Sequence, residues 1–197
     1  MLYLENMGIH VFFGLLSGVI ASAGFIPYIV SVLRKRTKPH PISWTLWAIV
    51  GFLILISYWG SGARETIWLA LINFLGPLTV AFFSIRYWDR GFTRFDYACL
   101  GIGLFGVLLW IIYRSAPLAL TFSIAADLFA NLPTIKKSYA DPKSENLTAW
   151  IIFVSANLIS LLAIRVWTYG VALYPIYQII SSGSVLFVVL FKKPKVN

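Results

Sequence analysis

Charged residues are scarce in this chain. Only 12% of its 197 residues are Asp, Glu, Lys or Arg, against about 25% in soluble proteins. Hydrophobic residues make up 59% of the chain, and the mean hydropathy is +0.82. A soluble domain of this size could not bury so much apolar surface. We therefore interpret the chain as an all-α integral membrane protein whose surroundings are the lipid bilayer.

Metal-binding and nucleophilic side chains are also few. One cysteine, Cys99, excludes an internal disulfide, and together with His10 and His40 it is too few ligands for a structural zinc site. An intramembrane hydrolase would need paired carboxylates, a metal cluster or an activated nucleophile. We therefore expect no cofactor, no metal and no enzymatic activity. The net charge of +9 indicates basic loops beside a membrane and no nucleic-acid partner.

Apolar stretches long enough to cross a bilayer recur along the chain. A transmembrane helix needs about 20 mostly apolar residues. The first stretch begins only at Gly8, after Glu5, and continues to Leu33, so we predict a retained span and no cleaved signal peptide. The seven predicted spans cover residues 8–33, 43–60, 65–86, 96–113, 116–138, 147–165 and 169–191.

The basic residues are distributed unevenly between the connections. Thirteen of the sixteen Lys and Arg residues fall in the first, third and fifth connections and at the C-terminus, among them Arg90, Lys137 and Lys193. The other side has only Arg64, Arg114 and Arg165. Because cytoplasmic loops carry the excess of Lys and Arg, we predict an outside N-terminus and a cytoplasmic C-terminus in the cell membrane.

One pattern occurs twice, at an offset of 106 residues. Pro27 precedes Trp44 by 17 positions, and Pro133 precedes Trp150 by the same separation, with a basic loop between them each time. The pattern predicts two three-helix repeats, residues 1–90 and 115–197, joined by a linker helix within 91–114. With one helix between them, the repeats are parallel, related by an axis along the membrane normal.

This three-one-three arrangement resembles the PQ-loop superfamily, which includes the SWEET sugar facilitators. In that superfamily a proline near the cytoplasmic end of the first helix of each repeat precedes a basic loop. Pro27-Tyr28 and Pro133-Thr134 hold these positions, so that Tyr28 and Thr134 stand where the namesake pair has glutamine. The resemblance implies a small-solute transporter that works by alternating access, with Pro27 and Pro133 as hinges.

Asp127 is the acidic residue that lies well inside a predicted span. It stands 11 residues after Ala116, about 16 Å along the helix and near the middle of the bilayer core. A carboxylate at that depth is costly unless it is paired, hydrated or protonated. Asp127 is therefore a candidate for proton coupling or substrate binding, and a protonated packing residue is the alternative. Asn131 lies on the same helical face four residues later.

Amides and aromatic residues supply the other candidates for a binding site. In SWEETs an asparagine on the third helix of each repeat holds sugar hydroxyls. Asn73 matches that position, whereas the second repeat has Ile179 there and Gln178 beside it. Hydrogen bonding between helices is the alternative role for these amides. The candidate substrate-binding residues are Asn73, Gln178, Asn157, Ser57, Trp68, Tyr174, Asp127 and Asn131.

Tryptophan and tyrosine are common near the predicted span ends, where amphipathic rings settle at the membrane interface. We predict this interfacial position for Trp44, Trp47, Trp88, Trp150, Trp167, Tyr87 and Tyr169.

Three functions remain open on the sequence. A sugar carrier, facilitative or proton-coupled, comes first. A carrier of vitamin nucleosides, similar to nicotinamide riboside transporters, comes second, and a receptor or interaction protein without transport comes third. The sequence leaves open whether the protein forms an oligomer.

Overall fold

The computed structural model describes residues 2–87, 91–113 and 115–192. Three residues predicted in connections or at the C-terminus, Arg90, Arg114 and Lys193, lie outside this part of the chain, as does Trp88, which is predicted at the membrane interface. Seven α-helices and one short 3₁₀ turn, Pro142–Ser144, make up the described structure: α1 (Leu2–Leu33), α2 (Pro41–Gly60), α3 (Ile67–Tyr87), α4 (Arg94–Ile112), α5 (Ala116–Ala140), α6 (Leu147–Leu162) and α7 (Tyr169–Phe191).

The predicted all-α class is confirmed, and six of the seven helices are long and apolar enough to cross a membrane. The exception is α6, which has 16 residues and ends at Leu162, three residues before the predicted limit. At 1.5 Å per residue it is about 24 Å long, whereas the hydrocarbon core is about 30 Å thick.

Several helix boundaries have identifiable local causes. Pro41 and Pro117 stand in the first turns of α2 and α5, where the missing N–H costs no helical hydrogen bond. Thr93 caps α4 in a reciprocal pair with Asp96, and the Asn146 side chain accepts from the Ala149 N–H to start α6. These caps and prolines lie at the ends of the apolar stretches, so these four helices begin within two residues of the predicted positions, whereas α1 begins at Leu2, six residues before the predicted start.

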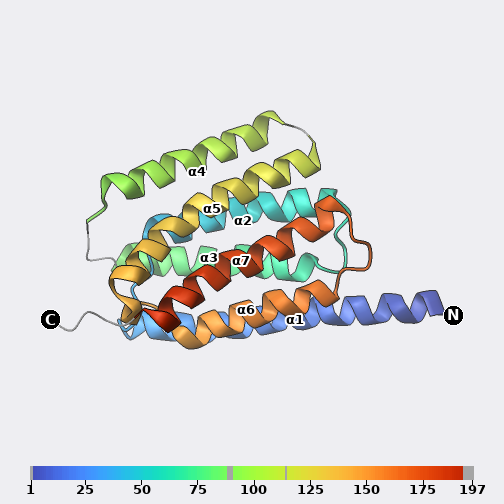
Figure 1. Ribbon diagram of the computed structural model, residues 1–197, viewed down its shortest axis with the longest axis horizontal. Coiled ribbons are helices and arrows are strands. Elements are labelled where there is room, and N and C mark those ends of the chain that lie inside the picture. The colour runs from blue at the N-terminus through green and yellow to red at the C-terminus, as the bar shows by residue number, and fades with distance from the viewer. Residues whose placement is uncertain (1, 88–90, 114, 193–197) are drawn as a thin grey trace.

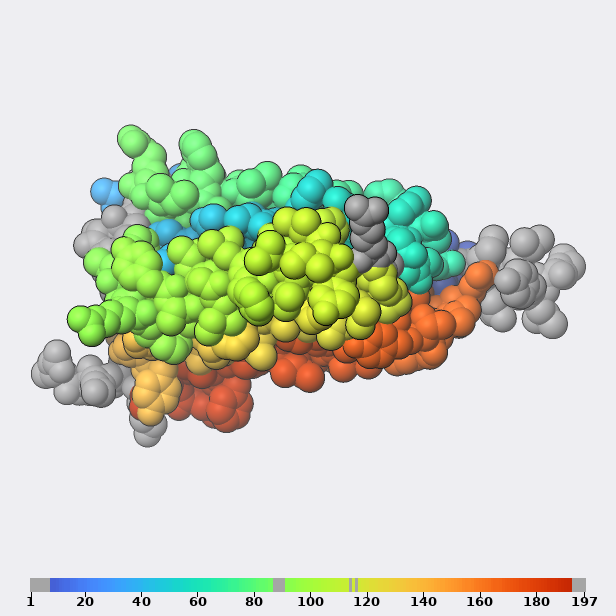
Figure 2. Space-filling model, turned by 90° about the horizontal axis from the view of Figure 1, so that it is seen from above, coloured from blue at the N-terminus to red at the C-terminus, as the bar shows by residue number. Residues whose placement is uncertain are grey.

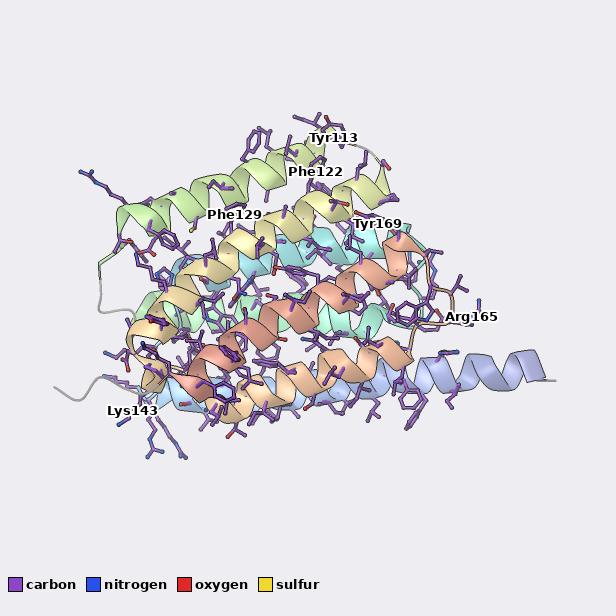
Figure 3. The ribbon with its side chains drawn as sticks, in the orientation of Figure 1. Tyr113, Phe122, Phe129, Lys143, Arg165 and Tyr169 are labelled. Carbon is purple, nitrogen blue, oxygen red and sulfur yellow. The ribbon has the colours of Figure 1, made fainter. Side chains whose placement is uncertain are left out.

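Figure 1 shows the helices lying lengthwise along the molecule, and the contacts of six of them form a closed ring. Going round it, α1 packs against α3, α3 against α2, α2 against α5, α5 against α7, α7 against α6, and α6 against α1. The remaining helix, α4, lies outside the ring on α5, with a smaller contact to α2. Figure 2 shows α4 in yellow-green on this outer face. Near one end of α4, Tyr113 packs on Phe122 of α5 with ring centroids 5.1 Å apart (Figure 3).

The bundle has two ends that differ in composition. We call the end formed by residues 34–40, 91–93 and 141–146 the basic end, and the end formed by residues 61–66 and 163–168 the opposite end. Lys143 marks the basic end and Arg165 marks the opposite end in Figure 3. Each helix of the ring runs from one end to the other, so residues near helix centres meet in the middle of the ring.

Candidate functional site

A cavity lies inside the ring. It contains about 560 Å³ of empty space, counting the part that is open to solvent. All six ring helices contribute to its wall, and among the described residues α4 contributes none. The lining residues are Phe25, Trp44, Trp47, Gly51, Ile54, Asn73, Pro77, Asp127, Trp150, Phe153, Asn157, Tyr174, Gln178, Ser181 and Ser182. A space that six helices enclose in common is the place where this fold can bind a small molecule.

Asp127 supplies the carboxylate of the cavity wall. Its exposed fraction is 5%, and its Oδ2 accepts a hydrogen bond of 2.7 Å from the Tyr177 hydroxyl on α7. Among the described lining residues, no Lys, Arg or His accompanies it. The cavity therefore carries a potential negative charge without a fixed positive charge in its wall.

Tyr174 connects the third helix of the first predicted repeat with that of the second. Its hydroxyl oxygen accepts hydrogen bonds from Asn73 Nδ2 on α3, at 3.0 Å, and from Gln178 Nε2 on α7, at 2.9 Å. Gly51 lets α2 approach α3 closely at this level, because a Cβ added there would lie 2.7 Å from the Asn73 backbone carbonyl oxygen. Two of the predicted amides and the predicted tyrosine thus meet at one hydroxyl.

Asn157 is fixed on α6 by two acceptors of α7. Its Nδ2 donates to the Gln178 backbone carbonyl at 3.2 Å and to Ser182 Oγ at 2.9 Å. The Ser182 hydroxyl in turn donates to the same carbonyl. Because a carbonyl only accepts, the amide nitrogen of Asn157 must face α7, and its side-chain oxygen faces away from these partners.

Aromatic rings form the part of the wall nearest the basic end. Phe25 and Phe153 have centroids 4.7 Å apart, Trp44 and Trp47 are 4.9 Å apart, and Trp150 lies 5.7 Å from Phe153. Trp44, Trp47 and Trp150 are all buried. The prediction that these three anchor the membrane interface is therefore wrong, because the ring encloses them. Trp167 and Tyr169 are exposed at the opposite end, and their position at the membrane interface stays a prediction.

Five of the eight predicted substrate-binding residues line this cavity, namely Asp127, Asn73, Gln178, Asn157 and Tyr174. The other three are not among its described lining residues. Ser57 faces α4 and accepts a 2.6 Å hydrogen bond from Trp110. Trp68 is 41% exposed. Asn131 is buried and donates to the Ser181 carbonyl and to Ser184 Oγ on α7.

The aromatic wall is the part of the site that the sequence analysis missed, and the repeat pattern contained a signal for it. The offset of 106 relates Trp44 to Trp150 and Trp47 to Phe153. Both halves thus carry aromatic residues at the same two positions of one helical face. This repetition indicates a surface shared by the two halves, and it is a more specific signal than the general preference of tryptophan for span ends.

A second polar cluster closes the basic end and was also missed. Glu145, in the connection before α6, accepts hydrogen bonds of 2.9 Å from the Tyr28 hydroxyl of α1 and from the Trp150 indole N–H. Its other oxygen is paired with Lys137 of α5. Lys137 also donates to the Lys38 carbonyl. This Glu145 junction joins the first predicted repeat to the second through buried charges.

His40 lies beside this junction, in the connection before α2. Its pKa is lowered from 6.5 to about 4, chiefly by burial of the imidazole and also by the nearby Lys137 and Lys136, although Asp96, 3.6 Å away, opposes the shift. His40 is therefore neutral at pH 7.

The predicted hinges, Pro27 and Pro133, both lie inside helices, α1 and α5 respectively. Near Pro27, the Asn146 side chain donates to the proline's carbonyl at 3.2 Å. Whether either proline acts as a hinge stays a prediction.

Comparison with known proteins adds no assignment: the chain matches no family model, no curated protein and no solved structure.

Proposed function

We propose that this protein is a membrane carrier for a small solute, which binds in the central cavity between two three-helix groups. The observation that carries the proposal is the cavity itself. It combines a carboxylate, three amides and a tyrosine hydroxyl with an aromatic wall, inside a ring of apolar helices. Polar side chains within membrane spans are costly and commonly mark the path of a substrate or ion.

The packing of the ring supports two related groups, α1–α3 and α5–α7. In each group the third helix packs against both others. Between the groups, α1 packs on α6 and α2 packs on α5, so the first helix of each group meets the second helix of the other. This pairing is what a two-fold axis along the membrane normal would give, as in parallel-repeat transporters.

The proposal includes the family resemblance and the orientation derived from the sequence. A PQ-loop or SWEET-like carrier places its substrate site between the repeats and opens it alternately to each side. The charge distribution puts the basic end in the cytoplasm. A sugar and a vitamin nucleoside stay the two substrates that the resemblance suggests.

Asp127 gives the proposed carrier a means of proton coupling. A carboxylate that faces a water-accessible cavity can bind a proton on one side of the membrane and release it on the other. The titratable groups beside it are the tyrosines Tyr177, hydrogen-bonded to it, and Tyr174.

The test is solute uptake into proteoliposomes with and without an inward proton gradient. The panel contains sugars, nucleosides and small amines. We expect uptake of at least one solute above the level of protein-free liposomes, and a rate that depends on the gradient. Asp127→Asn should remove the gradient dependence. Ser123→Ala is the matched control, because Ser123 is buried one turn away and its hydroxyl bonds only within α5. Failure to transport any of the panel argues against the carrier, and an unaltered gradient response in Asp127→Asn argues against the coupling.

A further inference from the structure

The cavity wall offers a ligand hydrogen-bond acceptors as well as donors. The amide nitrogens of Asn73, Gln178 and Asn157 are all used to bind protein groups. Their side-chain oxygens accept no hydrogen bond from the described residues, and none of these oxygens is a fully buried atom without a partner. The oxygens are therefore at least partly accessible, on three residues that line the cavity.

A minimum number of free acceptors remains however each amide is oriented. Asn157 is fixed because its nitrogen faces a backbone carbonyl. The Tyr174 hydroxyl carries a single hydrogen, so at most one of Asn73 and Gln178 could turn its oxygen towards it. At least two amide oxygens and the second oxygen of Asp127 thus remain to accept hydrogen bonds from a ligand.

The Asp127 carboxylate favours a ligand that carries positive charge, and the amide oxygens can accept hydrogen bonds from such a ligand. An anion would meet the Asp127 carboxylate with no described cation in the wall to balance the two negative charges, which is costly in a low-dielectric site. A neutral ligand would leave the ionised carboxylate without a counter-charge, with the Tyr177 hydroxyl as its hydrogen-bond partner. An ammonium group has three N–H donors, pairs with the carboxylate, and can use the amide oxygens at the same time.

The aromatic wall indicates the chemistry of the rest of the ligand. Along α6, Trp150 precedes Asn157 by seven residues, which is about 10 Å at 1.5 Å per residue. A molecule of that length would place its charge among the polar groups and its body against Trp44, Trp47 and Trp150. Flat apolar bodies stack on such rings, and aromatic faces also attract cations.

From this arrangement we infer that the cavity binds a small primary amine with an aromatic or apolar body, its ammonium group held by Asp127 and the amide oxygens. The inference rests on the proposed function only in taking the cavity as the substrate site. Binding is a separate property from transport, so the two can fail independently.

Three probes of nearly the same shape test the inference: 2-phenylethylamine, 2-phenylethanol and phenylacetate. Their binding to the detergent-purified full chain at pH 7 is measured by calorimetry and by the shift in melting temperature. We expect the amine to bind at least about ten-fold more tightly than the alcohol, a difference that one charged hydrogen bond can supply, and phenylacetate not to bind. Equal binding of amine and alcohol, or binding of none of the three, overturns the inference.

Variants of the protein test where the ammonium group binds. Asp127→Asn should weaken amine binding by at least about ten-fold, whereas Ser123→Ala should leave it unchanged. Tyr177→Phe provides a second variant, because it removes the hydroxyl that bonds to Asp127 and keeps the carboxylate. We expect Tyr177→Phe to retain the preference for amine over alcohol. Loss of the preference in Tyr177→Phe, or its persistence in Asp127→Asn, contradicts the assigned position. Amine binding without uptake of any solute would refute the carrier and leave this inference standing.

Discussion

The two ends of the ring are closed by different chemistry. At the basic end, the Glu145 junction joins α1, α5 and α6 through a carboxylate whose side chain is fully buried and an ammonium group that is nearly so. At the opposite end, the Tyr58 hydroxyl of α2 contacts Thr66 Oγ1 at 2.7 Å and the Val171 carbonyl of α7 at 2.9 Å. The ion pair there, Glu65 with Arg165 at 3.8 Å, is partly exposed.

This difference matters for how each end can open. Separating a buried ion pair exposes two charges that must be hydrated at once. Separating neutral hydroxyl contacts costs little, because water or lipid headgroups can replace the lost hydrogen bonds. The basic end should therefore open only together with its hydration, while the opposite end can open by small changes in packing. Substitutions at the two ends should differ in effect accordingly.

The largest effect is expected from Glu145→Gln. The substitution leaves the Lys137 ammonium group buried without its counter-charge, and breaking one partner of a buried pair costs about 3–5 kcal/mol. The free energy of unfolding, measured by detergent titration in mixed micelles, should fall by that amount.

The control is Glu65→Gln at the opposite end, which removes the partly exposed ion pair and should cost less than about 1 kcal/mol. Adding Lys137→Met to Glu145→Gln should recover part of the lost stability. Similar losses in Glu145→Gln and Glu65→Gln would show that the two ends do not differ as described.

Acidification should also destabilise the basic end selectively, through His40. Its pKa is about 4 in the folded protein and 6.5 ordinarily, so between these pH values the unfolded chain binds more protons. The contribution of His40 to stability is therefore complete above pH 6.5, falls as the pH drops towards 4, and amounts to about 3 kcal/mol at most.

The measurement compares unfolding free energies of the natural chain and of His40→Gln from pH 7 to pH 4. The difference between the two proteins should change over this range, because only the natural chain has the imidazole. A difference that stays constant with pH would contradict the shifted pKa of His40.

A smaller effect than that of Glu145→Gln or of His40 is expected from Tyr58→Phe at the opposite end. Loss of the hydroxyl leaves Thr66 and the Val171 carbonyl without this partner, and an unsatisfied buried group costs about 1–3 kcal/mol. We expect the lower part of that range, because no charge is left unpaired. The same detergent titration measures this loss of stability. The matched tyrosine variant at the basic end is Tyr28→Phe, which removes one neutral donor from Glu145. A larger loss in Tyr58→Phe than in Glu145→Gln would reverse the comparison.

The helices were predictable because apolar length and proline, Thr or Asn caps determine where they begin and end. The sequence could also place Asp127, Asn73, Gln178 and Asn157 near the middle of the bundle, since depth follows from position along a span. The sequence could not determine which face of each helix points into the ring. Trp68 and Tyr174 are related by the offset of 106, yet Trp68 is 41% exposed and Tyr174 is 1% exposed.

The aromatic wall and the Glu145 junction depended on tertiary packing. A tryptophan four residues into a span looks interfacial until other helices enclose that end, as they do around Trp44 and Trp150. Glu145 lies in a short polar connection and resembles an ordinary loop residue. Its partners, Tyr28 and Lys137, come from two other helices, and sequence separation alone does not bring them together.

The position of α4 makes the two seams between the groups unequal. The seam where α2 meets α5 is covered by α4, which contacts both helices. The described part of α4 does not contact α1 or α6, so the seam between those two helices has no such cover. If the groups α1–α3 and α5–α7 separate, we expect them to rotate about an axis on the α4 side. The gap between them would then be widest between α1 and α6. That seam would then be a lateral entrance, through which an amphipathic solute could pass from the bilayer into the ring.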